Sequence, residues 1–479
     1  MLRLTRSPLR GPSKRCMSAL PAYAFNPVAK FPGKRHPLQA QPKALSVSQL
    51  DNGMQVVSSD DKQSPISSLA LVVNAGTRFQ EGQAQQGIAQ WLKAYGFKTT
   101  NHRSTIRITR EAEIMGHCLS TGLTRENIFY QVEFRRDDLP DVVDLLADTL
   151  DGLLTRDAAP WGMYTREFVR KTKDWQDAAL QADAETALAH EKDPATLMFD
   201  SLFRVAFRQG LGNPLYPTGG SVDVKDVLTY VQKHVTPGKV TLVGSNVDAK
   251  DVSSSAKYYF GGLKAGAAGS AAPASRYFGG EHFEEVQASD DIVYGIAFQG
   301  APISQNDYFT AQVLQHLLGG NQDGAVKNGT SHGLLGDVGA SAQAQAFSSS
   351  FSDAGLFGVM VRGTDAAAVS EAAHKSVAAL KEVAAGRASA EAVKRAVEAT
   401  SMAFADDMEN APRFTKIQTL LTQAKTSKKL HTAKEMTAQL NQVTAEKITS
   451  LAGKMLKSKP SIAAVGDAFS LPHADDFKL

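Results

Sequence analysis

The histidines decide whether the chain could hold a catalytic metal on a helix. Two histidines four residues apart share one helical face and can both reach a zinc ion, and a glutamate beside them can act as the base for a metal-bound water. No two histidines of this chain are four residues apart, so neither His-x-x-Glu-His nor His-Glu-x-x-His occurs. The eleven histidines are His36, His102, His117, His190, His234, His282, His316, His332, His374, His431 and His473.

The cysteines exclude several other kinds of site. Cys16 and Cys118 are too few for a disulfide framework, a Cys-ligated zinc or an iron–sulfur cluster. Cys118 follows His117 in a strand-like run, and we expect a buried, inert thiol. His316 falls on an apolar helix without a matching second histidine, so we expect a satisfied or half-exposed side chain rather than a haem ligand. The sequence predicts no cofactor and no metal in this chain.

Residues 329–333 (GTSHG) match the G-x-S-x-G pattern of a nucleophilic serine. That pattern presents Ser331 for catalysis only at a turn between a strand and a helix. Here it follows a loop-like stretch, residues 319–324 (GGNQDG), so a Gly/Ser loop is the better interpretation. No Gly-Lys-Ser/Thr closes these glycines, so they predict no phosphate-binding loop.

Length and composition favour a soluble globular protein. The chain has 479 residues, of which 43% are hydrophobic and 21% are charged. At roughly 100–200 residues per domain, this length predicts two to four domains. No run approaches the roughly 20 apolar residues of a membrane-spanning helix. A role at a membrane would therefore place the protein on or beside the bilayer.

The N-terminal charge is typical of a mitochondrial transit peptide. Residues 1–50 hold nine basic residues and no acidic one, whereas residues 51–479 carry a formal charge of −6. We expect a transit peptide at residues 1–17, with cleavage between Met17 and Ser18, and an extended, proline-rich lead-in at residues 18–42. A basic arm that binds nucleic acid or anionic lipid is the alternative. The acidic remainder argues against a dedicated nucleic-acid binder.

Hydrophobic patterns predict an α+β unit in residues 43–260. Asn52-Gly53 between two strand-like runs is a strong hairpin signal. Ile88, Trp91, Leu92 and Tyr95 form one apolar face at helical spacing. Strands are expected at 44–48, 54–58, 64–74, 117–123, 126–134 and 239–244, and further helices at 104–115, 139–154, 165–190, 194–208 and 222–234.

The pattern restarts after residues 261–280, a stretch rich in Gly, Ala and Ser that we interpret as a linker. In residues 281–479 we expect strands at 291–298 and before Gly466, a helix over 309–318, and helices within 365–400 and 425–458. Residues 227–244 (VLTYVQKHVTPGKVTLVG) and 449–466 (TSLAGKMLKSKPSIAAVG) end the two parts alike. The predicted fold class is α+β, with two similar halves from a tandem duplication, each a mixed or antiparallel sheet packed with helices.

Three segments carry a family resemblance: residues 50–54 (LDNGM), 74–78 (NAGTR), and 87–89 (GIA) before an amphipathic helix. In this order they resemble the mitochondrial processing peptidase and pitrilysin-like metallopeptidase superfamily, whose subunits are duplicated α+β halves. There the helix carries His-x-x-Glu-His, and a glutamate on a later helix completes the zinc ligands.

The resemblance aligns Gln90, Lys93 and Ala94 with the zinc motif, and Glu185 falls near the later ligand. Both histidines of the motif are missing, and a lysine ammonium repels zinc and cannot act as a carboxylate base at neutral pH. The resemblance therefore implies a degenerate, non-catalytic peptidase homologue with no catalytic, cofactor-binding or metal-binding residue.

Further stretches resemble the core 2 subunit family of the mitochondrial cytochrome bc complex (ubiquinol–cytochrome c reductase, complex III). They are residues 175–180 (WQDAAL), 211–216 (LGNPLY), 313–320 (VLQHLLGG) and 346–358 (AFSSSFSDAGLFG). The resemblance covers nearly all of residues 43–470. It implies a scaffold subunit that supports the assembly and dimer stability of the respiratory complex, peripheral to the mitochondrial inner membrane on its matrix side. Its implied partners are core protein 1, cytochrome b, cytochrome c1 and the Rieske subunit.

Two other functions remain open at this point. One is a non-catalytic α subunit of the processing peptidase that binds presequences, for which residues 319–339 would correspond to a glycine-rich substrate loop. The other is an active metallopeptidase, which the missing motif all but excludes. The chains that co-purify with the protein distinguish the first alternative from a subunit of complex III.

Overall fold

The computed structural model of the chain describes residues 44–60, 64–100, 102–154, 173–217, 222–263, 274–285, 291–305, 307–319, 333–335, 342–409, 412–427, 432–467 and 470–477. All of them belong to one compact unit, Lys43–Leu479. The predicted transit peptide and lead-in lie outside the described residues. So do residues 329–332 of the G-x-S-x-G pattern.

The first half of the chain forms a six-stranded sheet in the order β1-β2-β6-β3-β5-β4. β2 and β6 run parallel, and the other neighbours run antiparallel. The hairpin predicted at Asn52-Gly53 is confirmed: it joins β1 to β2, and Gly53 has the positive φ of 90° that such a turn requires. The strands are β1 (Ala44–Gln49), β2 (Gln55–Asp60), β3 (Ile66–Val73), β4 (Cys118–Leu123), β5 (Ile128–Arg135) and β6 (Val240–Ser245).

Among its described residues, the second half repeats this topology without a counterpart of β1. Its sheet has the order β7-β11-β8-β10-β9, with β7 and β11 parallel and the remaining neighbours antiparallel. Strand for strand, this order matches β2-β6-β3-β5-β4, so the predicted duplication and fold class are confirmed. The strands are β7 (Gly280–Glu284), β8 (Ile292–Gly300), β9 (Ala342–Ser350), β10 (Gly355–Gly363) and β11 (Ser461–Val465).

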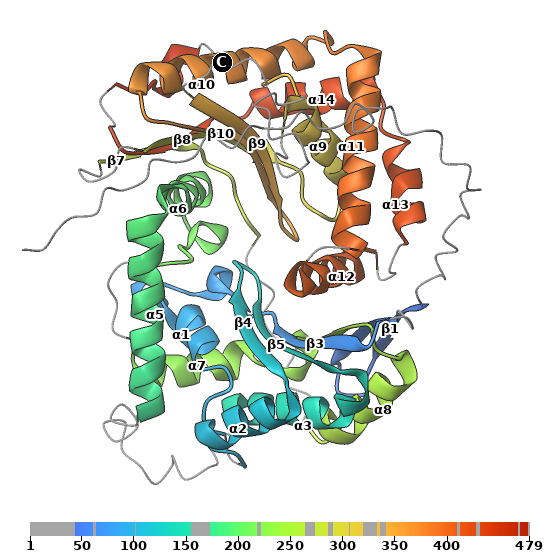
Figure 1. Cartoon of the computed structure of the whole chain (residues 1–479). Helices are drawn as coiled ribbons and strands as arrows, with labels where there is room; N and C mark the ends of the chain where they lie inside the picture. Colours follow the sequence, from blue (N-terminus) through green and yellow to red (C-terminus); the bar gives the residue numbers. More distant parts are fainter. Residues whose placement is uncertain are drawn as a thin grey trace, which may run out of the picture. The chain divides into compact units, whose positions relative to one another are not determined.

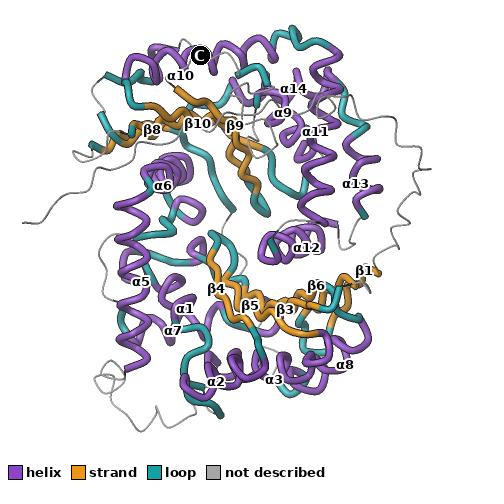
Figure 2. Tube along the Cα trace, viewed as in Figure 1, coloured by secondary structure: helices purple, strands orange, loops and turns teal. Residues whose placement is uncertain are grey.

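Helices cover the outer face of each sheet and bury one large apolar core per half (Figures 1 and 2). Against the first sheet lie α1 (Ile88–Ala94), α2 (Thr105–Met115), α3 (Leu139–Leu154) and α8 (Ala249–Phe260), while α7 (Val224–His234) packs against α1 and α3. Against the second lie α9 (Asp307–Leu318), α10 (Ala366–Ala384) and α14 (Ala445–Leu456), while α11 (Ala390–Glu409) and α13 (Ala433–Leu440) pack against α9.

The inner faces of the two sheets are covered by exchanged helices. After α5 (Lys173–Lys192), α6 (Pro194–Phe207) places Met198 and Leu202 against the second sheet, where Gly295 leaves room for the Met198 sulfur. From the second half, α12 (Arg413–Ser427) packs Ile417 and Leu420 onto the inner face of the first sheet. Each half therefore covers a sheet face of the other.

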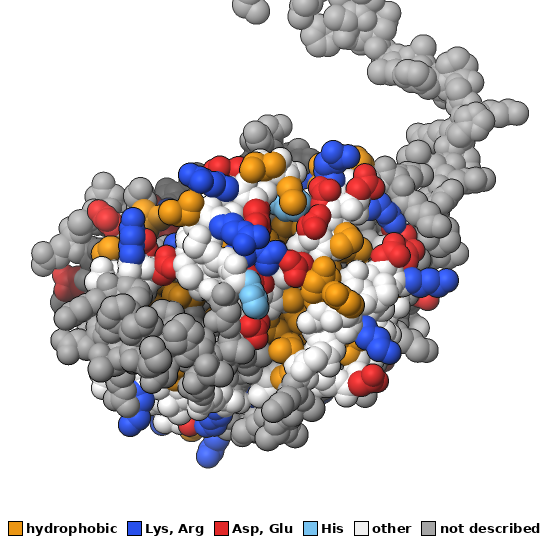
Figure 3. Space-filling model, turned by 90° about the horizontal axis from the view of Figure 1, so that it is seen from below, with side chains coloured by type: hydrophobic (Ala, Val, Ile, Leu, Met, Phe, Trp, Pro, Cys, Tyr) orange, Lys and Arg blue, Asp and Glu red, His pale blue; other side chains and the backbone are white. Residues whose placement is uncertain are grey.

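Figure 3 looks onto the layer of α2, α3 and α8 from below the view of Figure 1. Lys and Arg side chains are interspersed there with Asp and Glu. A mixed surface of this kind is ordinary for a soluble protein. Among the described side chains on this face, we see no extended basic surface that would suit a nucleic acid.

Several predictions change at the level of single elements. Cys118 is exposed rather than buried, because it begins the edge strand β4, on which the burial alternates along the chain. His316 is half-buried, with Nδ1 3.0 Å from the Gln312 carbonyl, as expected. β7, β9 and β10 were not predicted as strands. Within the predicted linker, the Tyr277 hydroxyl donates to the Lys459 carbonyl at 2.7 Å.

We expect the buried His234 to make folding weaker in acid. It packs against Phe79 and Tyr230, and burial, reinforced by Lys239 and Lys233, lowers its pKa from the ordinary 6.5 to about 4. The unfolded chain then binds the proton more tightly than the folded one below pH 6.5. The contribution of His234 is therefore complete above that pH and is lost as the pH falls towards 4.

Urea unfolding of His234→Gln and of the wild type, measured between pH 7 and 4, tests this expectation. The variant should lose less stability across the window than the wild type. His102→Gln, at an exposed position, should follow the wild-type curve. Identical pH slopes for the wild type and His234→Gln would contradict the assignment.

Candidate functional site

α1 holds the positions of the degenerate zinc motif against α5. Trp91 lies in the core, and its ring centroid is 4.2 Å from that of Trp175 on α5 and 4.7 Å from that of Tyr95. The apolar face predicted from the helical spacing of Ile88, Trp91, Leu92 and Tyr95 is therefore buried and holds α1 against the core. The side chains of Gln90 and Lys93 lie on the side of α1 that contacts α5.

The structure brings Gln90, Lys93 and Glu185 together at the contact of α1 with α5. Lys93 Nζ donates to Glu185 Oε2 at 2.7 Å. Gln90 Nε2 donates to the Ala182 carbonyl at 3.0 Å and lies 3.0 Å from the Thr186 hydroxyl. Ala94, at the third motif position, is buried in the core. α1 and α5 are thus joined by an ion pair and by hydrogen bonds of the Gln90 amide.

These residues do not fit a zinc ion. Zinc in proteins is held by imidazole, thiolate and carboxylate donors. Ala94 offers no donor atom, the amide of Gln90 is engaged by α5, and the Glu185 carboxylate is bound to the Lys93 ammonium. The Lys93 ammonium neutralises the Glu185 carboxylate, as a metal ion would in an active relative. The ion pair therefore stabilises the packing of α1 against α5.

We expect Lys93→Met to destabilise the chain by about 1–2 kcal/mol, because it leaves the Glu185 carboxylate without its ion pair in a half-buried place. The side chains of Lys93 and Glu185 are 17% and 28% exposed, so solvent screens the pair only in part. Lys233→Met is the matched control. Its Nζ also lies 2.7 Å from a carboxylate, that of Glu81, but these side chains are 39% and 65% exposed.

The control should cost less than about 1 kcal/mol, the usual range of a surface pair. The free energy of unfolding in urea is the measurement. Equal losses for Lys93→Met and Lys233→Met would show that the Lys93–Glu185 pair has no special role.

A cavity of about 280 Å³ adjoins this pair and is walled by both halves. Tyr216 lines it, and burial together with nearby carboxylates, Glu185 first, raises the pKa of its phenol, which stays protonated. From the other half Phe414 closes the cavity over β4, where a Cβ on Gly122 would come within 2.5 Å of the phenyl ring. Gly122 thus permits the close contact of α12.

The turn between β4 and β5 is the junction of the two halves. Arg125 is buried and donates to Asp200 of α6 at 2.5 Å and to the Leu211 carbonyl at 3.2 Å. Asp200 in turn accepts from the backbone N–H groups of Leu215 and Tyr216 at 3.0 and 3.2 Å. The LGNPLY segment, residues 211–216, is thus held around one buried ion pair.

The next residue of the turn, Glu126, joins two segments that lie far apart in the sequence, one at Arg78 and one at Ser352. Its carboxylate accepts from Arg78 at 2.7 Å and from the Ser352 hydroxyl at 2.6 Å. Arg78 also donates to Asp353 at 2.5 Å. Asn127, one position further, accepts from Lys425 of α12 at 2.8 Å.

Sequence reasoning missed Arg125, Glu126, Asp353 and Lys425 as functional residues. The segments at 74–78 and 346–358 were distinguished only by the family resemblance that they carry. However, an ion pair between residues 275 positions apart leaves no pattern in a single sequence. These motifs hold the halves together and lie outside the degenerate metal site.

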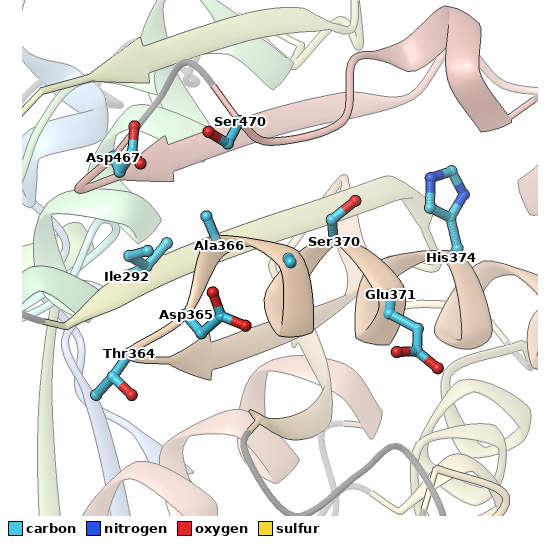
Figure 4. A pocket seen from close by; sticks show the side chains of 10 residues that line it. Ile292, Thr364, Asp365, Ala366, Ser370, Glu371, His374, Asp467 and Ser470 are labelled. Atoms are coloured by element: carbon cyan, nitrogen blue, oxygen red, sulfur yellow. The ribbon is translucent and has the colours of Figure 1, made fainter.

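A larger open hollow of about 1060 Å³ lies beside the start of α10 (Figure 4). Three of the polar side chains that line it have structural roles. Asp365 caps α10, Glu371 pairs with Lys375, and the His374 ring lies 4.8 Å from the ring of Phe477. Among the described residues no group of three or more His, Cys, Asp and Glu side chains could hold a metal ion.

Comparisons with known proteins agree with this architecture. A family model described as insulinase (peptidase family M16) matches residues 55–219, and one described as peptidase M16 inactive domain matches residues 221–400. A solved chain of complex III2 from Candida albicans, with Inz-5 bound, superposes with a TM-score of 0.75 at 18% identity. The match covers 91% of this chain and 99% of that one, so the two share a fold.

Curated relatives share a higher sequence identity with this chain than that solved structure does. The mitochondrial cytochrome b-c1 complex subunit 2 of Neurospora crassa is 31% identical over 442 residues, covering 89% of this chain and 90% of the relative. The Homo sapiens protein of the same name is 30% identical over 452 residues, covering 91% and 92%. The fold and the degenerate site define an M16-type peptidase homologue without catalytic function. The chain belongs, within that class, to the family of the mitochondrial cytochrome b-c1 complex subunit 2.

Proposed function

We propose that the chain is a core scaffold subunit of mitochondrial complex III. Similarity to subunit 2 proteins over nine-tenths of the chain carries this proposal. A Lys93–Glu185 ion pair in place of a metal site fits a structural role, because it stabilises the α1–α5 packing and offers no activated water.

The proposal extends to partners and place. The chain would pack against core protein 1 and support a dimeric complex that contains cytochrome b, cytochrome c1 and the Rieske subunit. It would lie on the matrix side of the inner membrane. In the part of the chain that the structure describes, no helix has the length and apolar character to span a bilayer. Haem and iron–sulfur chemistry would belong to the other subunits, and this chain would hold no cofactor or metal and bind no nucleic acid.

The boundaries of the chain's parts are also proposals. Residues 1–17 would be a removable transit peptide and residues 18–42 a lead-in. Residues 43–260 and 281–479 would be the two halves, joined by the linker at 261–280. N-terminal sequencing of the protein isolated from mitochondria tests the first boundary, and a start at Met1 would refute the transit peptide.

Purification of the native protein through a C-terminal affinity tag, followed by identification of the co-purifying chains, tests the function. We expect cytochrome b, cytochrome c1 and the Rieske subunit together with this chain. Recovery with only a zinc-containing peptidase subunit would instead support a presequence-binding α subunit. Deletion of the gene should deplete the assembled complex on native gels, and reintroduction should restore it. A complex of normal abundance after deletion would refute the scaffold role.

A further inference from the structure

Four cationic side chains that no described carboxylate neutralises come together at the end of α6. Arg204 lies in the last turn of α6, and Arg208 follows its last residue. Arg276 belongs to the segment that leads into β7, and Lys459 lies in the turn that leads into β11. All four are exposed, and none of their side chains forms an ion pair or a hydrogen bond with a described residue.

Backbone contacts hold these three segments side by side. The Phe278 N–H donates to the Ala206 carbonyl at 2.8 Å and fixes the lead-in of β7 against the end of α6. The Tyr277 hydroxyl donates to the Lys459 carbonyl, and a Cβ on Gly279 would come within 3.0 Å of the Lys459 Cβ. The fold itself therefore gathers the cations, where α6 lies beside β7 (Figure 1).

The half-buried ring of Phe278 holds two of the guanidinium groups. The Arg208 Cζ lies 4.4 Å and the Arg276 Cζ 5.2 Å from the centroid of this ring. A cation–π contact restrains a guanidinium without neutralising it, so its N–H groups stay available to an acceptor. Arg208 reaches the ring from a backbone with a φ of 61° and a ψ of −49°, outside the regions that residues with a side chain normally adopt.

The charge of this cluster is not cancelled by the acidic residue beside the lead-in of β7. Asp353 accepts from the Ser275 N–H at 2.8 Å, but Arg78 binds the same carboxylate oxygen at 2.5 Å. At the end of α6, burial lowers the pKa of Arg125, and the positive charge of Arg204 adds to that shift. Arg204 therefore acts on its surroundings as an unneutralised charge.

We propose that Arg208 and Arg276, with Arg204 and Lys459 beside them, bind the phosphate group of an anionic ligand. An arginine donates two parallel N–H bonds to a phosphate, and clusters of arginines are a recurring way to recognise this group. A phosphate carries more oxygens and more charge than a single carboxylate, so several unneutralised cations at one place favour it. The site goes beyond the proposed scaffold role and does not depend on it.

Calorimetric titration of the purified full-length chain with inorganic phosphate tests the site. Arg208→Gln and Arg276→Gln should each weaken binding at least about tenfold, because each removes charge-assisted hydrogen bonds. Arg208→Lys keeps the charge but loses the planar fork, so it should bind more weakly than the wild type and more tightly than Arg208→Gln.

Arg395→Gln is the matched control. It removes another exposed arginine, on α11, that has no ion pair with a described residue. This variant should bind phosphate as the wild type does. Urea unfolding of all the variants should give free energies close to that of the wild type, so that a loss of binding reports on the site and not on folding.

Vesicles identify the source of the phosphate. The chain is sedimented with phosphatidylcholine vesicles that contain or lack phosphatidylglycerol. Retention that requires phosphatidylglycerol, and that is lost in Arg208→Gln but not in Arg395→Gln, assigns the site to a lipid headgroup. Binding of inorganic phosphate without such retention assigns the site to a soluble phosphate compound.

Three results would overturn the proposal. They are the absence of binding to both probes, an equal loss in Arg395→Gln and Arg208→Gln, and displacement of bound phosphate by an equimolar glutamate-rich peptide. The last result would make the cluster a contact for an acidic protein segment.

These outcomes separate the phosphate site from the proposed function. A chain that binds phosphate but never co-purifies with cytochrome b refutes only the scaffold role. A chain that enters complex III but binds neither probe refutes only the phosphate site.

Discussion

Arg125→Met should destabilise the chain by about 3–5 kcal/mol, the largest loss that we expect from any single polar substitution. Removing one partner of a buried ion pair leaves the other charge without compensation. Arg125 binds Asp200, and its guanidinium also lies 4.1 Å from the centroid of the Phe203 ring. Burial lowers the pKa of Arg125, and the Asp200 carboxylate opposes that shift by stabilising the guanidinium.

The free energy of unfolding in urea measures this loss, and two further variants interpret it. Arg135→Met removes an exposed arginine whose Nη2 lies 3.6 Å from Asp137, and it should cost less than about 1 kcal/mol. The double variant Arg125→Met/Asp200→Leu should be less destabilised than the sum of its parts, because no charge remains buried alone. A loss below about 1 kcal/mol in Arg125→Met would show that the junction does not depend on this pair.

Gly76→Ala should cost about 2–3 kcal/mol through sterics alone. Gly76 has an ordinary φ of −73°, so an alanine meets no backbone strain there. Its Cβ would, however, come within 2.5 Å of the carbonyl oxygens of both Thr124 and Arg125. These are backbone atoms of the junction turn, which cannot rotate away. The substitution must therefore displace the turn or the segment that carries Arg78.

Gly238→Ala is the matched control, since its Cβ would meet nothing within 4 Å. We expect it to be neutral. Thermal and urea unfolding of both variants provide the comparison, and hydrogen exchange of the turn amides provides a local one. Faster exchange at Glu126 and Asn127 in Gly76→Ala only is the expected result. Equal stability of the two alanine variants would contradict the close approach.

The fold was largely predictable where local patterns are strong. Alternation around Asn52-Gly53 predicted the first hairpin, and 3.6-residue periodicity predicted α1. Helices were also expected at 104–115 and 139–154, where α2 and α3 lie. β7 (GEHFE) and β9 (AQAQAFSSS) were missed because edge strands carry polar and small residues with weak strand preference. A helix was predicted over 194–208, where α6 lies, but the sequence could not show against which sheet it packs, and α12 was not predicted.

For the site, the sequence allowed only the prediction that zinc would not be bound there. Gln90, Lys93 and Ala94 could be identified as unfit for zinc from side-chain chemistry. The ion pair between Lys93 and Glu185, which replaces the metal's charge, joins residues 92 positions apart and requires the relative placement of α1 and α5. The same holds for Arg78, Glu126 and Asp353, whose contacts depend on how the duplicated halves meet.

The exchange of α6 and α12 has a consequence for what counts as a domain in this chain. The duplication suggests a seam at residues 261–280, yet each half leaves the inner face of its sheet to a helix from beyond that seam. A fragment ending at the seam would present Val57, Ala70 and Val243 to water and would carry an α6 with nothing to cover. The repeated unit of the sequence is thus no longer a unit of folding. Peptide-bond cleavage in the linker would yield two pieces that remain bound, and neither would be soluble alone.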